Sequence, residues 1–264
     1  MSNVFCVVNT KGGVGKSTIA SQIIPILFRN KNKRIKIYEI DDNNKTFFKN
    51  SKIEFNTLKV SRTEDVIDDV NVDLMLDEED VVNIIDAGGG NDTKAVLEGI
   101  KKAEIKGIVY IIPVNDDFEQ FQNTKHTIEV IRDFDKNAKI FLLFNRVFSF
   151  SRKDIENQFI AFFGSEEYGI EGRFDEIFEY IENNILMIQN TQIFSILKNF
   201  YNTTLYDFYF ENKDLIENSE KYKKEWVKKG RDYFKKQMKH FRFAKDVFDL
   251  IKYIDKYANF LQGK

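Results

Sequence analysis

Residues 10–18 read TKGGVGKST, a run of residue types whose spacing is suited to binding phosphate. Glycines allow a tight turn that directs backbone N–H groups at phosphate oxygens. Lys16 places a positive charge where β- and γ-phosphates would lie, and the hydroxyl of Ser17 suits a Mg²⁺ ion. The strict phosphate-loop consensus has glycine where this chain has Thr10, so the loop departs from it at one position.

Short apolar segments that alternate with helical segments would position this loop. We expect strands at 4–8, 34–40, 81–85, 107–114 and 139–144, and helices from Lys16 to about Asn30, kinked at Pro25, and at 126–134. Such alternation indicates βαβ units and a parallel sheet. The expected fold is therefore an α/β P-loop NTPase fold, with a mostly parallel twisted sheet flanked by helices.

Functional residues of parallel sheets gather at the carboxyl ends of the strands. The glycine loop follows the first expected strand, Asp41 the second, Asp86 the third and Asn145 the fifth. These residues are therefore predicted to meet at one edge of the sheet.

After about residue 150 the pattern becomes mostly helical, over 152–163, 174–183, 192–201 and 213–261, with one apolar run at 185–188. No linker rich in Pro, Gly or Ser separates the two halves. We therefore expect a single domain over 1–264, with a nucleotide-binding core at 1–150 and a mainly helical part at 151–264. Segments 45–80 and 151–218 carry almost no functional signal.

The composition restricts the possible functions. The chain has 264 residues, a formal net charge of -2, one cysteine (Cys6) and two histidines. One cysteine cannot form an intrachain disulfide, a zinc cluster or an iron–sulfur site. No targeting signal and no apolar stretch of the roughly 18 residues that span a bilayer is found, so we expect a cytoplasmic protein.

The segment from Lys11 to Thr18 resembles the deviant Walker A motif of the ParA/MinD family of P-loop ATPases, and ordered landmarks extend this resemblance over about residues 1–150. The resemblance implies ATP hydrolysis that stays slow until a partner stimulates it. It also implies a homodimer when ATP is bound, in which Lys11 reaches the partner's phosphates. The implied ATP-binding residues of the loop are Lys11, Gly12, Gly13, Val14, Gly15, Lys16, Ser17 and Thr18.

The resemblance also assigns roles to the two acids. Residues 39–41 read Glu-Ile-Asp where the family usually has Asp-x-Asp, and Asp42-Asn43 replaces a frequent Pro-Gln. Asp41 would position the attacking water or a Mg²⁺-bound water, and a carboxylate near Mg²⁺ is suited to either role. Asp86 resembles the Walker B acid, so the implied Mg²⁺ site comprises Ser17, Asp41 and Asp86, and the implied catalytic residues are Lys11, Lys16 and Asp41.

Two further positions follow from the same resemblance. Gly88-Gly89-Gly90 stands where the family often has prolines, and three glycines permit the dihedral changes that a γ-phosphate-sensing switch needs. The alternative is a flexible loop that does not switch. Asn145 matches an asparagine whose amide reads the adenine edge, which a donor and an acceptor side by side can do. The alternative for Asn145 is a cap at the end of a strand.

The segment 219–245 carries eleven Lys and Arg against three acidic residues, a net charge of +8, while the rest of the chain carries -10. Binding to nucleic-acid phosphates needs several cations on one face, and ParA-type proteins bind DNA without sequence specificity when ATP is bound. The candidate DNA-binding residues are Lys223, Lys224, Lys228, Lys229, Arg231, Lys235 and Lys236. The alternatives are a solvated helix face and a membrane or protein partner.

The end of the chain has apolar residues at helical spacing: Phe241, Ala244, Val247, Phe248, Ile251, Ile254, Ala258 and Leu261. Core packing explains such a stripe. The alternative is a MinD-like membrane helix, which Asp246, Asp249 and Asp255 oppose.

We therefore expect a ParA-like, Mg²⁺-ATP-dependent ATPase that segregates or positions a plasmid or chromosome cargo. Its activator would be a ParB-like or other protein, and it would be cytoplasmic, and nucleoid-associated if it binds DNA. The alternatives are a MinD-like membrane-cycling ATPase, an accessory ATPase of conjugative DNA transfer, and a binding module without hydrolysis. A metabolic enzyme of the dethiobiotin-synthetase type is disfavoured by Lys11, and a metal insertase by the lone Cys6.

Overall fold

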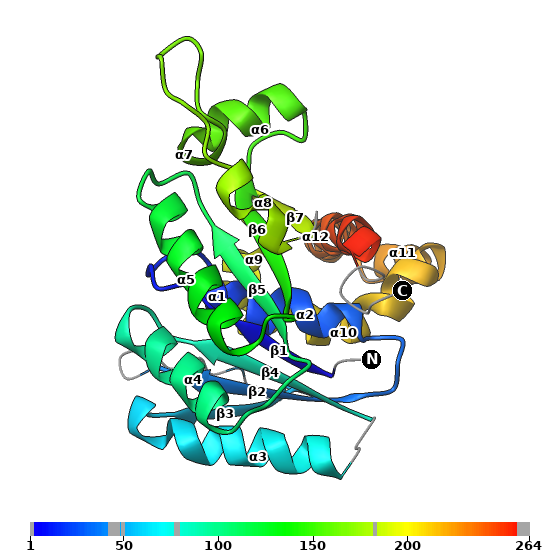
Figure 1. Ribbon diagram of the computed structural model, residues 1–264. Helices are drawn as coiled ribbons and strands as arrows, with labels where there is room; N and C mark the ends of the chain where they lie inside the picture. Colours follow the sequence, from blue (N-terminus) through cyan, green and yellow to red (C-terminus); the bar gives the residue numbers. More distant parts are fainter. Residues whose placement is uncertain (1–2, 42–47, 49–50, 77–79, 182–183, 258–264) are drawn as a thin grey trace.

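A seven-stranded sheet forms the centre of the protein in the computed structural model, which describes residues 3–41, 48, 51–76, 80–181 and 184–257. The strand order is β3-β2-β4-β1-β5-β6-β7, and each neighbouring pair is parallel (Figure 1). The strands are β1 (Val4–Val7), β2 (Arg34–Ile40), β3 (Glu54–Leu58), β4 (Val81–Ala87), β5 (Val109–Val114), β6 (Lys139–Val147) and β7 (Ile185–Gln189). The expected parallel α/β fold is confirmed.

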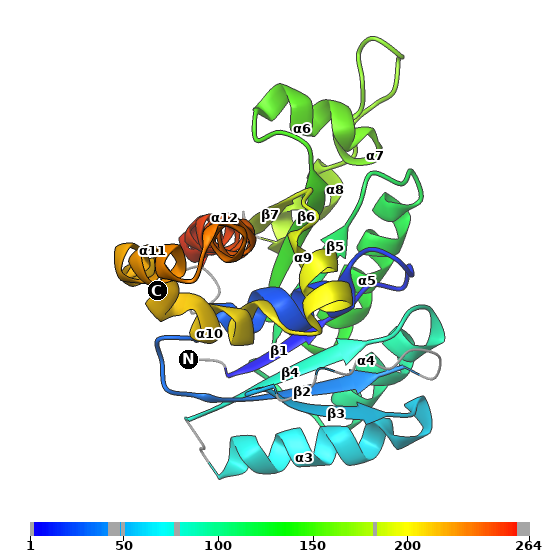
Figure 2. The ribbon, with the colours of Figure 1, turned by 180° about the vertical axis from the view of Figure 1, so that it is seen from behind.

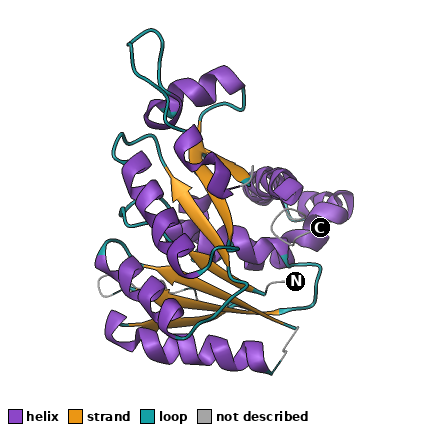
Figure 3. Cartoon of the chain, viewed as in Figure 1, coloured by secondary structure: helices purple, strands orange, loops and turns teal. Residues whose placement is uncertain are grey.

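Helices cover both faces of this sheet, so that the strands form one layer between two helical layers (Figure 3). The first face packs against α3 (Thr63–Met75), which follows the short η2 (Val60–Arg62), and against α4 (Asn91–Lys102), α5 (Gln120–Phe134), α6 (Arg152–Gln158), α7 (Ile160–Phe163) and α8 (Asp175–Ile181). Its buried core includes Val66, Val96, Ile128, Phe162 and Ile177, one from each of five helices. An apolar stripe on each helix therefore faces the sheet.

The second face packs against helices from the two ends of the chain (Figure 2). These are α1 (Lys16–Thr18), η1 (Ile19–Ile23), α2 (Ile24–Leu27), α9 (Ile193–Ile196), η3 (Leu197–Tyr201), α10 (Leu205–Glu217) and the C-terminal half of α12 (Arg231–Ile254), which continues into η4 (Asp255–Tyr257). The phosphate-loop helix is thus enclosed by the helical C-terminal part of the chain.

The helix after the glycine loop is interrupted where a proline was expected to distort it. Its middle, η1, is a π-helix, and Pro25 lies in the first turn of α2. Proline has no N–H to donate to the preceding turn, and π-helical turns accommodate such irregularities. The helix ends at Leu27, three residues earlier than expected.

Further elements differ from the expected pattern, including α10, which begins at Leu205, eight residues before the helical segment expected from 213. Strand β3, in the segment without functional signal, is an edge strand that no residue pattern indicated. Helix α5 begins at Gln120, six residues before the expected start.

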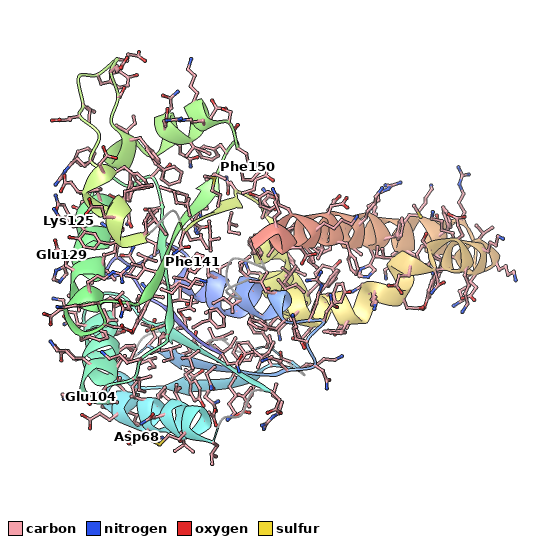
Figure 4. The ribbon with its side chains drawn as sticks, turned by 45° about the vertical axis from the view of Figure 1, so that its right-hand side comes forward. Asp68, Glu104, Lys125, Glu129, Phe141 and Phe150 are labelled. Carbon is pink, nitrogen blue, oxygen red and sulfur yellow. The ribbon has the colours of Figure 1, made fainter. Side chains whose placement is uncertain are left out.

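A helical arm extends from the sheet on the side opposite α5 (Figure 4). It consists of α11 (Ser219–Lys228) and the N-terminal half of α12, and Trp226 is buried within it. The other half of α12 returns to the body, where Ala244, Val247, Ile251 and Ile254 are buried in the second core. Core packing therefore accounts for these positions of the apolar stripe, and Ala258 and Leu261 lie outside the described residues. Among the described helices, none is long and apolar enough to cross a membrane.

Candidate functional site

The glycine loop between β1 and α1 wraps around the ammonium group of Lys16. Nζ of Lys16 donates hydrogen bonds to the carbonyl oxygens of Asn9 and Lys11, both at 3.0 Å. Gly13 and Gly15 have φ values of 76° and 99°, a region that residues with a Cβ rarely adopt. Burial lowers the pKa of Lys16, and neighbouring carboxylates, Asp86 foremost, oppose that change. The loop is therefore a preformed cradle with one buried cation at its base.

A cavity of 290 Å³ lies on this cradle at the carboxyl ends of the strands. It brings together most of the predicted phosphate- and metal-site residues. Its lining is Gly12, Gly13, Gly15, Lys16, Ser17, Thr18, Asp41, Asp86, Ala87, Gly88, Gly89 and Arg146. Asp42 and Asn43, the positions where this chain departs from the Pro-Gln of the family, lie outside the described residues.

Asp86 is the residue of this cavity that most clearly requires a cation. Its side chain is 4% exposed, and its Oδ1 atom is buried without a hydrogen-bond partner. Burial raises the pKa of Asp86 to about 7, a hydrogen bond from Ser17 lowers it, and the charge of Glu39 raises it. A buried carboxylate oxygen without a partner, next to a serine hydroxyl, is the donor set that Mg²⁺ prefers. Ser17 and Asp86 therefore fit a magnesium ion.

The three glycines after β4 lie directly against the phosphate loop. The N–H group of Gly88 donates to the carbonyl oxygen of Ile40 at 2.8 Å, and that of Gly90 donates to the carbonyl oxygen of Thr10 at 2.8 Å. The Thr93 hydroxyl contacts the carbonyl oxygens of Asn9 and Gly88 at 3.0 and 2.6 Å. This segment thus joins the ends of β2 and β4 to the first residues of the loop.

Lys11 does not line the phosphate cavity of its own chain. Its ammonium group lies 2.6 Å from Glu119 and 3.4 Å from Asp117, in the segment between β5 and α5. The hydrogen bond to Glu119, followed by that to Asp117, raises the pKa of Lys11. The role of Lys11 at a partner's phosphates stays a prediction.

Asn145 is buried at the end of β6, and its amide contacts the phosphate loop. Its Nδ2 group donates to the carbonyl oxygen of Val14 at 2.8 Å, and its Oδ1 atom accepts from the N–H group of Arg146 at 3.0 Å. A Cβ atom at Gly15 would lie 2.3 Å from Asn145 Nδ2, so only glycine fits there. Asn145 thus holds the loop, and its contact with adenine stays a prediction.

A second cavity, of 370 Å³, adjoins the first beyond Ser17 and Thr18. Amide, hydroxyl and cationic side chains dominate its lining: Ser17, Thr18, Ser21, Gln22, Asn145, Arg146, Gln189, Asn190, Thr191, Phe194, Ser195, Lys198 and Asn199. Residues 189–199 come from the segment in which the sequence showed no function. Since the apolar run at 185–188 proves to be a seventh parallel strand, the polar residues after it could have been found by the strand-end rule that located Asp41 and Asp86.

The predicted DNA-binding residues belong to the arm, which Figure 4 shows, and none of them lines either cavity. Lys223 is half-buried and forms an ion pair with Glu220 at 2.7 Å. The others are exposed: Lys224, Lys228, Lys229, Arg231, Lys235 and Lys236.

A family model covers the elements that carry this site. Residues 5–170 match the sequence model of the CobQ/CobB/MinD/ParA nucleotide binding domain. A search of curated proteins gives no significant match. Similar solved structures include the MinD cell division protein of Aquifex aeolicus, with 12% identity, 76% of this chain and 86% of that chain covered, and a TM-score of 0.47. The ATP complex of an McdA variant from Cyanothece has 14% identity, coverage of 78% and 91%, and a TM-score of 0.47.

The matched region begins in β1 and ends beyond β6, so it contains the glycine loop, Asp41, Asp86 and Asn145. It also covers more than half of the chain. The chain therefore belongs to the family of the CobQ/CobB/MinD/ParA nucleotide binding domain.

Proposed function

We propose that this protein is a ParA-like ATPase that binds Mg²⁺-ATP, dimerises while ATP is bound, and positions a plasmid or chromosome cargo by binding DNA without sequence specificity. The observation that carries the proposal is the phosphate cavity, where the cradle around Lys16 and the unpartnered oxygen of Asp86 lie on the same 290 Å³ space.

Each residue of this cavity has its own role in phosphoryl transfer to water. The backbone N–H groups of the loop and the Lys16 ammonium bind the β- and γ-phosphates and stabilise the charge that develops on transfer. Ser17 and Asp86 would hold the metal, which would supply neutralisation of the phosphate charge. Asp41, half-buried at the end of β2, orients the attacking water. Chemistry of this kind depends on positioning and electrostatics, so no histidine base is required.

Dimerisation and activation belong to the same proposal. Lys11 would leave its own carboxylates and reach the phosphates of a second copy, and a ParB-like or other partner would accelerate hydrolysis. The protein would act in the cytoplasm, associated with the nucleoid. A single domain over 1–264 belongs to this proposal, and the packing of the C-terminal helices in one core with the loop helix supports it.

The arm supports the DNA-binding part of the proposal. On α11, Lys221, Lys224 and Lys228 are exposed at spacings of three and four residues, which places them on one face. On α12 the same spacing relates the exposed residues Arg231, Lys235, Lys239 and Arg242. In the described part of the arm, Lys223 alone forms an ion pair, so the other cations stay available for phosphate groups.

Several aromatic residues of the arm contribute to its packing. Trp226 is buried, the Lys223 ammonium lies 5.0 Å from the centre of the Phe241 ring, and that of Lys229 lies 5.1 Å from the Tyr233 ring. Contacts of this kind stabilise the packing of two helices. DNA would therefore be bound through charge, with a steep dependence on salt.

The test is binding of a non-specific DNA duplex in ATP and in ADP across a salt series. Three proteins are compared with wild type: Lys16→Ala; an arm variant with alanine at Lys228, Lys229, Lys235 and Lys236; and a charge-matched control with alanine at the exposed residues Lys31, Lys94, Lys136 and Lys153.

We expect DNA binding that needs ATP, weakens with salt, is lost in Lys16→Ala and in the arm variant, and persists in the control. Equal loss in the arm variant and the control would assign binding to net charge rather than to the arm. Absence of DNA binding by an ATP-bound dimer would remove the DNA-positioning role, and the same proteins would then be tested on anionic liposomes.

A further inference from the structure

Arg146 has a backbone conformation that is unusual for its place in the fold. Its φ value is 59°, in the left-handed region, although it lies within strand β6. The other described non-glycine residues with positive φ are Asn32, Glu104 and Asn202. Glu104 and Asn202 follow the end of a helix, where this conformation is common, and Asn32 lies in the turn before β2. A strained residue within a strand, at the edge that carries the site, indicates a function.

The strain arises from a β-bulge. Asn145 pairs with Ile188 of β7 and Val147 pairs with Gln189, so Arg146 is an extra residue on the β6 side. Bulges redirect one side chain and are frequent beside active sites. Here the buried neighbours Asn145 and Val147 keep their places, and the exposed Arg146 is turned to the carboxyl edge of the sheet.

Three hydrogen bonds hold the bulge. The N–H group of Arg146 donates to Asn145 Oδ1 at 3.0 Å, and Gln158 Nε2 donates to the Arg146 carbonyl oxygen at 2.9 Å. Gln158 Oε1 also accepts from the N–H group of Phe148 at 3.0 Å. The Nδ2 atom of the same Asn145 amide donates to the carbonyl oxygen of Val14. The position of Arg146 is therefore linked through Asn145 to that of the phosphate loop.

The redirected side chain lies between the two cavities of the site. Arg146 lines both the phosphate cavity and the adjoining one, and among the described residues only Ser17 and Thr18 share that property. Its guanidinium has no ion pair within the described chain. The cationic residues that line the phosphate cavity are Lys16 and Arg146, and its lining also contains the carboxylates of Asp41 and Asp86.

We infer that Arg146 is a further phosphate ligand of this site, and that it binds the α-phosphate of a nucleoside di- or triphosphate. The inference rests on the proposed nucleotide site. The two terminal phosphates would lie on Lys16 and the loop, and the base side of the nucleotide would lie in the second cavity. The α-phosphate, which is nearest the base, would then lie where the two cavities meet, and Arg146 lines both cavities there. A planar guanidinium can make two parallel hydrogen bonds to such a phosphate, which an ammonium cannot.

The test compares Arg146→Gly and Arg146→Lys with wild type by calorimetric titration of ATP, ADP and AMP. Glycine removes the guanidinium and also suits a φ of 59°, so Arg146→Gly should have a Tm equal to or above that of wild type. Asn202→Gly, at φ 50° on an exposed helix end outside both cavities, is the matched control for relief of backbone strain. Lys16→Ala is the control for the nucleotide site itself.

We expect Arg146→Gly to weaken ATP and ADP binding alike, by about 10- to 100-fold, as loss of charge-assisted hydrogen bonds does. Arg146→Lys should recover part of the loss, and Asn202→Gly should bind as wild type does. Unchanged affinity in Arg146→Gly overturns the inference. A loss confined to ATP overturns the α-phosphate assignment, and a lowered Tm with equal loss in Arg146→Lys indicates a structural role. If folded wild type binds no nucleotide, the proposed function itself fails.

Discussion

The ammonium group of Lys11 lies 2.6 Å from a carboxylate oxygen of Glu119 and 3.4 Å from one of Asp117. The neighbouring residue joins the same segment, since the Thr10 hydroxyl contacts Asn123 Oδ1 at 3.2 Å. The first residues of the phosphate loop are thus attached to the start of α5. Lys11 can reach another molecule only after its two ion pairs separate.

We therefore expect the double variant Asp117→Asn, Glu119→Gln to dimerise with ATP at a several-fold lower protein concentration than wild type, because a free Lys11 need not exchange partners. Sedimentation velocity with ATP and with ADP measures this shift. The double variant Asp68→Asn, Glu129→Gln, at exposed carboxylates of α3 and α5 (Figure 4), controls for the change in net charge. If the double variant dimerises less readily than wild type, the two carboxylates assist Lys11 instead of restraining it.

Asp86 should make the stability of the nucleotide-free chain fall as pH rises. Its pKa is about 7 in the folded chain against 3.8 in an exposed carboxyl group, so between these values the folded state binds the extra proton. As pH rises through this window, the free energy of unfolding therefore falls, and Asp86 contributes roughly 2–4 kcal/mol to that fall. The loss is complete above pH 7, where Asp86 is buried and charged.

Asp86→Asn removes the charge, so its advantage in stability over wild type should grow from pH 4 to pH 7 and then level off. Urea unfolding of both proteins at each pH isolates this difference from the other carboxylates. The same variant should lose the dependence of ATP binding on Mg²⁺. A difference in stability that is constant with pH would mean that Asp86 does not titrate in this range.

Local pattern was enough to locate the strands that carry the site, because buried parallel strands are short apolar runs and their last residues meet at one edge. Strand β3 was not predicted, because it is a half-buried edge strand and its sequence, EFNTL, is not a continuous apolar run. The partners of the site residues could not be predicted, since Lys11 and Glu119 are 108 residues apart and Asn145 and Val14 are 131 apart. Such contacts depend on how whole elements pack. The positive φ of Arg146 is equally a product of that packing, through the bulge against β7.

Gly15→Ala should abolish nucleotide binding and lower the free energy of unfolding by at least about 2 kcal/mol. The new methyl group would lie 2.3 Å from Asn145 Nδ2, and the φ of 99° disfavours any side chain. Gly12→Ala is the matched control in the same loop, because no atom lies within 4 Å of its Cβ position and its φ is not positive. Urea unfolding and ATP titration measure both effects. If the two variants are equally stable, the contact between Asn145 and the loop is not a constraint on the fold.

The first turn of α10 connects the nucleotide site to the arm. Gln22, which lines the second cavity, accepts a hydrogen bond from the N–H group of Leu205 at 2.5 Å. Two residues later the buried carboxylate of Asp207 accepts from the Ser51 hydroxyl at 2.6 Å, the Lys52 N–H group at 2.8 Å and the Thr204 hydroxyl at 2.7 Å. The start of α10 is therefore anchored both to the loop helix and to the residues that lead into β3.

Asp207→Ala leaves these three donors without their acceptor, and the cost is largest for the buried Thr204 hydroxyl, since the bonds from Ser51 and Lys52 are part-buried. We expect the free energy of unfolding to fall by about 2–4 kcal/mol, whereas Asp246→Ala, at an exposed position of α12, should change it by less than about 0.5 kcal/mol. Urea unfolding measures both.

Hydrogen exchange then measures which part of the chain the Asp207 hydrogen bonds stabilise. In Asp207→Ala the amides of α10, α11 and the first half of α12 should exchange faster than in wild type, while those of β1 and β4 keep their protection. Uniformly faster exchange would mean that Asp207 stabilises the whole chain and that the arm has no separate attachment at this turn.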